Sequence, residues 1–197
     1  MQEFKNAINQ NDIKTVKQCM KNLDPSADYN WAIRYASYGH LEIVQLLLSD
    51  PRVDPTADDN YAIRFASVYG HLEVVRLLLS DPRVDPNVYD NFAIHWASTN
   101  GYIKTVRLLL SDPRVDFNAI ENKEMKRQLL KEERNKLRQE FTFRYQVIQK
   151  SSPQILIEGK QKSKIPSDLI RKIVYEASYQ ERSTSIRLLA LASLLKN

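Results

Sequence analysis

The stretch from Asn60 to Asp81 reads Asn-Tyr-Ala-Ile-Arg-Phe-Ala-Ser-Val-Tyr-Gly-His-Leu-Glu-Val-Val-Arg-Leu-Leu-Leu-Ser-Asp, and it recurs twice more with few changes. The other two copies begin at Asn30 and Asn91, so the periods are 30 and 31 residues. A period of this length is typical of repeat proteins, in which a small unit is stacked against copies of itself.

Each copy predicts two short helices. A compact apolar cluster indicates the first helix, and Gly70 then supplies the flexible backbone that ends a helix and begins a turn. The second helix carries one apolar stripe at spacings of three and four residues, and the motif Ser80-Asp81-Pro82 ends it. The apolar residues are Ala62, Ile63, Phe65 and Ala66 in the first helix, and Leu72, Val75, Leu78 and Leu79 in the second.

The repeated unit also resembles a known family. Residues 66–79, Ala-Ser-Val-Tyr-Gly-His-Leu-Glu-Val-Val-Arg-Leu-Leu-Leu, resemble the second half of an ankyrin repeat. The connection Asp-Pro-Arg-Val-Asp-Pro, at 50–55 and again at 81–86, resembles that of ankyrin arrays in large DNA viruses and some microbial eukaryotes. The resemblance implies a scaffold that holds another protein and catalyses no reaction.

The pattern divides the chain into repeats and a different C-terminal part. Residues 1–120 are expected to be ankyrin repeats, with an N-terminal capping repeat at 1–25 and further units at 26–55, 56–86 and 87–117. After them we expect a degenerate repeat that becomes a long charged helix at 118–150, a linker at 151–165, and a C-terminal helical pair at 166–197. The predicted fold class is all-α, an ankyrin-repeat solenoid of stacked helix-turn-helix units followed by the long helix and the helical pair. One face of the long helix is expected to dock on the open end of the solenoid.

The chain departs from the family at the start of each first helix. The family's Thr-Pro-Leu-His segment is replaced by Trp-Ala-Ile-Arg at 31–34, Tyr-Ala-Ile-Arg at 61–64 and Phe-Ala-Ile-His at 92–95. We therefore hypothesise that Asn30, Asn60 and Asn91, which precede these segments, cap the helices with their side chains. Replacing Asn60 with alanine should then cost about 1 kcal/mol.

The resemblance also implies where a partner would bind, because the family uses its hairpin tips and inner helices. The positions that vary from copy to copy are the candidates, and exposed tyrosines are favoured at binding hot spots. For any single position, neutral variation on a solvated surface is the alternative explanation. The candidates are Ala27, Asp28, Tyr38, Ala57, Asp58, Val68, Tyr69, Val88, Tyr89, Thr99 and Asn100.

A second resemblance lies near the C-terminus. The segment from Ile165 to Val174, Ile-Pro-Ser-Asp-Leu-Ile-Arg-Lys-Ile-Val, resembles the opening of an F-box, which docks on the adaptor of cullin ubiquitin ligases. The resemblance implies a substrate adaptor whose docking face is Leu169, Ile170, Ile173 and Val174. The alternative is that this face packs on the long helix as a C-terminal cap.

Charge is distributed unevenly along the chain. Residues 1–120 carry 12 basic and 15 acidic side chains, whereas residues 121–197 carry 17 basic and 9 acidic ones. The basic C-terminal third makes nucleic acid an alternative partner. Acidic residues such as Glu132 and Glu133 interleave with the basic ones, however, and this favours an ordinary solvated helix face.

Sequence signals for catalysis, cofactors and metals are missing. The chain contains no Walker-type phosphate loop, dinucleotide glycine motif, nucleophile elbow or zinc-protease motif. Cys19 is the only cysteine, so an intramolecular disulfide and a cysteine-rich zinc site are excluded. We expect no enzyme, no cofactor and no metal.

The sequence also bears on location. No apolar stretch reaches the roughly 18 to 20 residues that a membrane-spanning helix requires. The opening residues 1–6 lack the features of a secretory signal. We expect a cytoplasmic protein, in the host cytoplasm if the source is viral, with a protein partner and no membrane.

Overall fold

The computed structural model describes the backbone of residues 2–151 and the side chains of residues 2–140. All regular structure within residues 2–151 is helical, without a strand. The chain divides into two units, residues 1–122 and residues 123–197.

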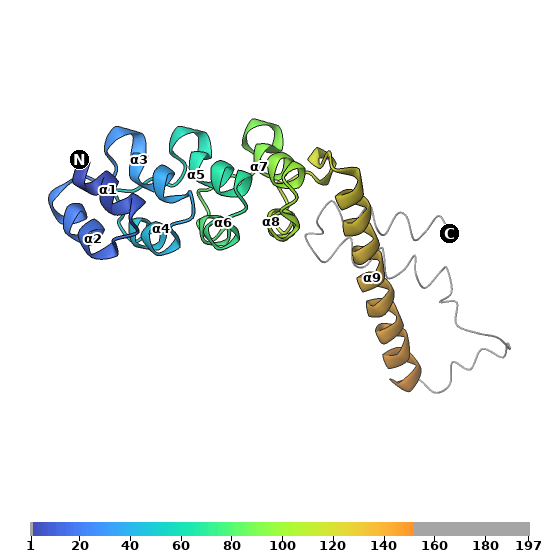
Figure 1. The fold of residues 1–197 in the computed structure, drawn as a ribbon. Coiled ribbons are helices and arrows are strands. Elements are labelled where there is room, and N and C mark those ends of the chain that lie inside the picture. Colours follow the sequence, from blue (N-terminus) through green and yellow to red (C-terminus); the bar gives the residue numbers. More distant parts are fainter. Residues whose placement is uncertain (1, 152–197) are drawn as a thin grey trace, which may run out of the picture. The chain divides into compact units, whose positions relative to one another are not determined.

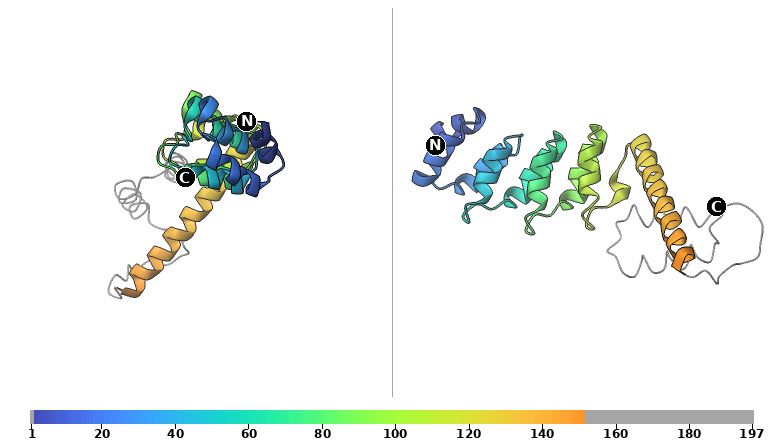
Figure 2. Two further views of the ribbon diagram at one scale, coloured as in Figure 1. Left: turned by 90° about the vertical axis from the view of Figure 1, so that its left-hand side faces the viewer. Right: turned by 90° about the horizontal axis from the view of Figure 1, so that it is seen from below.

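The first unit is a row of helix pairs, each joined by a tight turn (Figures 1 and 2). The pairs are α1 (Gln2–Asn9) with α2 (Ile13–Asn22), α3 (Ala27–Ala36) with α4 (Leu41–Leu48), α5 (Ala57–Val68) with α6 (Leu72–Leu79), and α7 (Val88–Thr99) with α8 (Ile103–Leu109), followed by the short 3-10 helix η1 (Phe117–Ala119). Helices α3, α5 and α7, the first helices of their pairs, pack side by side, and so do the second helices α4, α6 and α8. The predicted solenoid of stacked helix pairs is confirmed.

The second unit begins with one long helix, α9 (Lys123–Ser151). This helix confirms the long helix predicted for the charged segment. Met125, Leu129 and Leu137 are buried and lie four and eight residues apart, which places them on one face of α9. Docking of that face on the solenoid stays a prediction. The proposed linker and C-terminal helical pair lie outside the described residues.

The buried stripe of the second helix α6 is rotated relative to the predicted one. In α6, Val74, Val75 and Leu78 are buried, whereas Leu72 and Leu79 are only half-buried. The reason is that α6 packs on α5 and also on its neighbours α4 and α8, so its buried face is turned towards Val74. Sequence spacing had identified the helix and missed this residue.

The turn between α5 and α6 shows why glycine recurs there. Gly70 has a φ of 70°, in the left-handed region where residues with a side chain are strained. A Cβ atom at this position would also overlap the ring of Tyr102 in the next repeat. The predicted glycine turn is confirmed, and the neighbouring repeat adds a second reason for it.

Near its N-terminal end, each of the helices α3, α5 and α7 is interrupted by a left-handed turn of three residues, which we call a tip. All nine residues have φ between 50° and 65°. Asparagine and aspartate tolerate this conformation better than other side chains, and they occupy seven of the nine positions. The tips are Asp28, Tyr29 and Asn30; Asp58, Asp59 and Asn60; and Tyr89, Asp90 and Asn91.

The hypothesis that the recurring asparagines cap their own helices is wrong. The Asn60 side-chain oxygen Oδ1 accepts a hydrogen bond from the backbone N–H of Asp85, at 2.9 Å, in the connection to the next repeat. Asn30 and Asn91 make the same contact with the next connection, at 2.8 and 2.7 Å. The physical reason is the left-handed backbone of the tip, since a helix cap usually needs extended backbone. Each of these asparagines therefore ties the tip of its repeat to the connection that leads to the next repeat.

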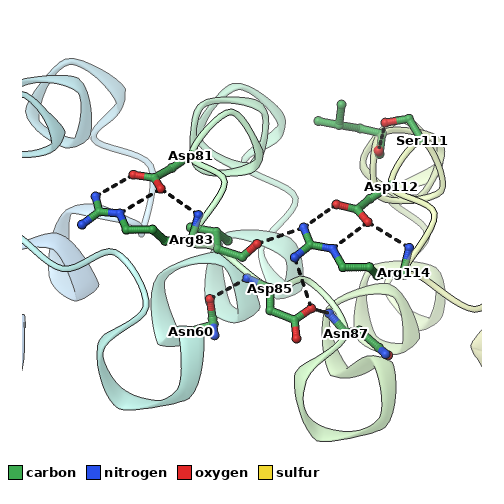
Figure 3. Close-up of polar contacts among 10 residues, drawn as sticks. Asn60, Asp81, Arg83, Asp85, Asn87, Ser111, Asp112 and Arg114 are labelled. Atoms are coloured by element: carbon green, nitrogen blue, oxygen red, sulfur yellow. Dashed lines mark hydrogen bonds and ion pairs between the residues drawn. The ribbon is translucent and has the colours of Figure 1, made fainter.

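The connection Asp-Pro-Arg-Val-Asp closes on itself (Figure 3). The Asp81 carboxylate accepts hydrogen bonds from the backbone N–H of Arg83 at 3.0 Å and from Nε and Nη2 of its guanidinium at 3.0 and 2.7 Å. The bonds from the Arg83 side chain hold the pKa of Asp81 below its usual range. Val84, the next residue, is fully buried. The same pairing recurs in the other two connections, so the motif is a structural clasp.

Two of the clasps also reach the preceding repeat, and in the first of them Arg52 donates from Nη2 to the backbone carbonyl of Met20 at 3.2 Å. Arg114, held by Asp112, donates from Nη2 to the backbone carbonyl of Val84 at 3.0 Å (Figure 3). Ser111, just before this connection, donates to the carbonyl of Leu108 at 2.6 Å and so satisfies the end of α8. These contacts stabilise the fold, and this explains why the same residues recur in each connection.

Candidate functional site

Helices α3, α5 and α7 each carry two aromatic residues four positions apart. In α5 they are Tyr61 and Phe65, whose rings are stacked at 4.0 Å between centroids. Side chains at this spacing lie one above the other on the same helix face. The equivalent pairs are Trp31 and Tyr35 in α3, and Phe92 and Trp96 in α7.

The stacking of the repeats joins these pairs into one array of rings. Tyr38 connects α3 to α5, because its ring centroid lies 5.9 Å from that of Phe65 and 5.3 Å from that of Tyr69. Phe65 in turn lies 6.4 Å from Phe92 of α7. These distances are those of favourable aromatic pairs. We call this array the aromatic ladder; it comprises Trp31, Tyr35, Tyr38, Tyr61, Phe65, Tyr69, Phe92 and Trp96.

The members of the ladder differ in exposure. Trp31 is buried, whereas Tyr35 and Tyr69 are each 49% exposed and Trp96 is 40% exposed. Large apolar side chains that lie exposed next to one another mark interaction surfaces more often than chance allows. The ladder therefore meets the requirements of a binding surface.

Hydrogen bonding fixes the centre of the ladder. The hydroxyl oxygens of Tyr38 and Tyr61 are 2.6 Å apart and share a hydrogen bond. Burial, and then the bond to Tyr61, raise the pKa of Tyr38 well above its usual value. The hydroxyl bond between Tyr38 and Tyr61 therefore joins the turn after α3 to α5.

Two arginines lie against the rings. The Arg64 guanidinium carbon Cζ lies 4.7 Å from the ring centroid of Tyr89 and 5.4 Å from that of Phe92, both in the next repeat. Its Nε and Nη2 donate to the backbone carbonyls of Asp59 and Asp58, each at 3.0 Å. These distances are within the range of cation–π contacts. The guanidinium is therefore held by aromatic faces and tip carbonyls together.

Arg34 repeats this arrangement one unit earlier. It forms an ion pair with the Asp58 carboxylate and donates from Nη2 to the carbonyl of Asp28 at 3.3 Å. Its Cζ also lies 5.4 Å from the ring centroid of Tyr61. The third repeat has His95 at this position, whose ring lies 5.3 Å from that of Trp96.

The tips border the ladder with carboxylates and phenols. Tyr29 is 84% exposed and Tyr89 is 61% exposed, the two highest values among the large apolar residues described. The Tyr89 hydroxyl donates to the Asp59 carboxylate at 2.7 Å, and this bond raises the pKa of Tyr89. We call the exposed part of the tips the tip row; it comprises Asp28, Tyr29, Asp58, Asp59, Tyr89 and Asp90.

The candidate residues from the sequence fall into three groups. Tyr38 and Tyr69 lie in the ladder. Asp28, Asp58 and Tyr89 lie exposed in the tip row. The remaining candidates belong to neither group, and they are Ala27, Ala57, Val68, Val88, Thr99 and Asn100.

Two residues of that last group have structural contacts. Asn100 donates from Nδ2 to the carbonyl of Val68 at 2.8 Å and so links adjacent turns. Thr99 donates to the carbonyl of His95 within its own helix at 3.0 Å. Neither contact prevents binding of a partner protein. Each contact, however, gives its residue a structural role that needs no partner protein.

Sequence reasoning missed much of the surface that the fold brings together. Tyr35, Trp96 and Arg64 were absent from the candidates, although all three face the ladder or the tip row. One signal in the sequence could have found the two aromatic residues, namely the recurrence of an aromatic pair at a spacing of four in every repeat. Arg64 had no such signal, because its ring partners include residues of the next repeat.

Within the described residues, no group of three or more His, Cys, Asp or Glu side chains is placed to hold a metal ion. Across that same part of the chain, no helix has the length and apolar character needed to cross a membrane. Cys19 is buried, and burial raises the pKa of its thiol. Both properties are typical of a structural cysteine rather than a reactive one. The proposed docking face Leu169, Ile170, Ile173 and Val174 lies outside the described residues.

Comparison with models of known protein families gives a match. A family model described as ankyrin repeats, in three copies, matches residues 30–121. This range contains the ladder and the tip row except for two residues of the first tip. None of the curated proteins compared with this sequence matches it.

Proposed function

Residues 30–121 are ankyrin repeats, and from this premise we propose that the chain is a scaffold that binds a partner protein through the aromatic ladder and the tip row. Ankyrin repeats generally mediate protein–protein interaction, and the family is typically non-enzymatic. The partner would lie across the first helices α3, α5 and α7 and contact the tips at their N-terminal ends.

The exposure of the ladder supports this proposal best. Tyrosine and tryptophan dominate the residues whose loss weakens protein interfaces, and they do so from well-packed positions. Tyr35, Tyr69 and Trp96 are held by ring contacts on one side and are open on the other. Such pre-ordered side chains lose little conformational freedom when a partner binds.

The test is capture of partners from a eukaryotic cell extract by the full chain, with identification by mass spectrometry. The variant Tyr35→Ala/Trp96→Ala removes two exposed rings of the ladder. The matched control is Tyr102→Ala, which removes a tyrosine of similar exposure outside the ladder. We expect the double variant to lose specific partners that the wild type and the control retain. Equal capture by all three proteins would contradict the proposal.

A substrate adaptor for a cullin ubiquitin ligase is the second candidate function, supported by the F-box-like sequence from Ile165 to Val174. In that case the ladder would hold the target and the C-terminal segment would recruit the ligase. Replacing Leu169 and Ile173 with alanine in the full chain should remove cullin-ligase subunits from the captured proteins and leave the ladder-dependent partners. If no ligase subunit is captured by the wild type, the adaptor function is refuted and the scaffold remains.

Two further predictions from the sequence are unchanged. A cytoplasmic site of action, in a host cell if the source is viral, stays a prediction. The alternative function, nucleic-acid binding by the basic C-terminal third, also stays a prediction.

A further inference from the structure

We propose that the tip row and the adjoining rings bind an extended basic segment of the partner, with arginine or lysine side chains seated one to a repeat. This inference rests on the proposed scaffold function and adds the chemistry of the ligand. Two observations support it. The chain's own arginines already bind to this surface, and the negative charge of the tip row exceeds the positive charge of those arginines.

The internal arginines show what this surface binds. Arg64 lies over the Tyr89 and Phe92 rings while it donates to the carbonyls of two tip residues. Arg34 makes the corresponding carbonyl and ring contacts one repeat earlier and adds an ion pair with Asp58. Two successive repeats therefore hold a guanidinium between tip and ring, and the same combination suits a cation supplied by another chain.

The tip row carries more negative charge than these arginines balance. It has four aspartates, whereas Arg34 and Arg64 are the two arginines that contact it. The carboxylates of Asp28 and Asp90 are exposed and have no hydrogen bond or ion pair within the described residues. A cationic partner would therefore find two free carboxylates, one at each end of the row.

The third repeat has no arginine at the position equivalent to Arg34 and Arg64. His95 stands at the position of Arg34 and Arg64, with its Nδ1 3.8 Å from a carboxylate oxygen of Glu121. Asp90 and the exposed ring of Trp96 belong to this repeat. A partner side chain that reached this repeat would meet a carboxylate and an aromatic face, as Arg34 does at Asp58 and Tyr61.

The two exposed tip tyrosines are suited to contact a cationic side chain. Tyr29 and Tyr89 have φ of 58° and 51°, a conformation that is costly for residues other than glycine, asparagine and aspartate. They are also the most exposed large apolar side chains described. A phenol ring with a free face attracts a cation more strongly than an aliphatic side chain does. The strain and the exposure are both consistent with a role in contact.

The stacking sets the spacing expected in the partner. Neighbouring helices pack about 8–10 Å apart, and an extended chain rises about 3.3 Å per residue. A segment that runs along the tip row would therefore place a cation in successive repeats with roughly every third residue.

The probe is a fluorescent synthetic peptide with arginine at every third position and glycine or serine between. Its comparator has citrulline, the neutral analogue of arginine, at the same positions. Binding to the full chain is measured by fluorescence anisotropy at low and at physiological salt. We expect the arginine peptide to bind at least about tenfold more tightly than the citrulline peptide, with a difference that shrinks as salt screens the charges.

The protein variant is Asp28→Asn/Asp90→Asn, because asparagine is also tolerated at the left-handed tip positions. The matched control is Glu42→Gln/Glu73→Gln, which makes the same change in net charge on the exposed second helices α4 and α6. The tip variant should weaken arginine-peptide binding about fivefold or more, and the control should leave it unchanged.

Three results would overturn the inference: no measurable binding of the arginine peptide, equal binding of the citrulline peptide, or equal weakening by both double variants. The scaffold function is judged separately by partner capture with Tyr35→Ala/Trp96→Ala. If capture depends on these two rings while the arginine peptide fails, the basic ligand is refuted and the scaffold function stands.

Discussion

Replacement of Asn60 by alanine should destabilise the array more than the loss of a helix cap would. Asn60 is 7% exposed, and its Oδ1 accepts from the Asp85 N–H at 2.9 Å. Leaving that part-buried N–H without its partner costs about 1–3 kcal/mol. Alanine at a φ of 57° adds about 1–2 kcal/mol of backbone strain. We therefore expect Asn60→Ala to lower the free energy of unfolding by about 2–5 kcal/mol.

Three further variants separate the two contributions. Asn60→Gly removes the hydrogen bond without the strain and should cost about 1–3 kcal/mol. Asn60→Asp keeps an acceptor and tolerates the left-handed backbone, so it should cost least. Asp90→Ala introduces the strain alone, about 1–2 kcal/mol, since Asp90 is exposed and its carboxylate has no partner within the described residues.

The assay is urea unfolding of the full chain, followed by the helical circular dichroism signal, with stability obtained by linear extrapolation. If Asn60→Gly unfolds at the same urea concentration as the wild type, the hydrogen bond between Asn60 and Asp85 contributes nothing to the free energy of unfolding. The recurrence of asparagine at the end of each tip would then need another explanation. If Asn60→Ala costs no more than Asp90→Ala, the strain explains the whole effect.

Three other predictions concern single residues of the repeats. Gly70→Ala should cost at least about 1 kcal/mol more than Gly101→Ala, because a Cβ at Gly70 overlaps the Tyr102 ring whereas one at Gly101 meets nothing within 4 Å; equal losses in thermal stability would contradict this. The lowered pKa of Asp81 means that its clasp stabilises the fold above the unfolded pKa of about 4 and ceases to do so as pH falls through the folded pKa. The urea midpoint should therefore fall more on acidification in the wild type than in Asp81→Asn, and identical pH profiles would refute the clasp. Ser67→Ala should leave stability unchanged or raise it by up to about 1 kcal/mol, since the buried hydroxyl has no hydrogen-bond partner within the described residues; a clear loss in urea unfolding would show that it has one.

The repeat architecture was predictable because its signals are local. A period of 30 or 31 residues, apolar spacings of three and four, and a glycine between helices are each read from neighbouring residues, and all three agreed with the structure. The long helix α9 was predictable for the same reason, since strong helix formers without glycine need no distant contact to form a helix.

The binding surface was only partly predictable. Tyr38, Tyr69 and Tyr89 were identified because variable tyrosines at loops are common contact residues. Tyr35 and Trp96 were missed because an aromatic pair on one face of a helix is as well explained by a buried core. Whether it is exposed depends on how far the neighbouring repeat covers it.

The sequence by itself determined the type of fold, the positions of the helices and the turns, and the residues that recur. Tertiary structure alone decided what the recurring and variable residues contact. Asn60 bonds to Asp85, and Arg64 lies over Tyr89, each pair separated by about one repeat along the chain. Such contacts depend on the register and tilt with which one repeat stacks on the next, and these are set by the packing of whole helices. No local sequence pattern records that packing, so the link between repeats and the aromatic ladder became visible only in the assembled structure.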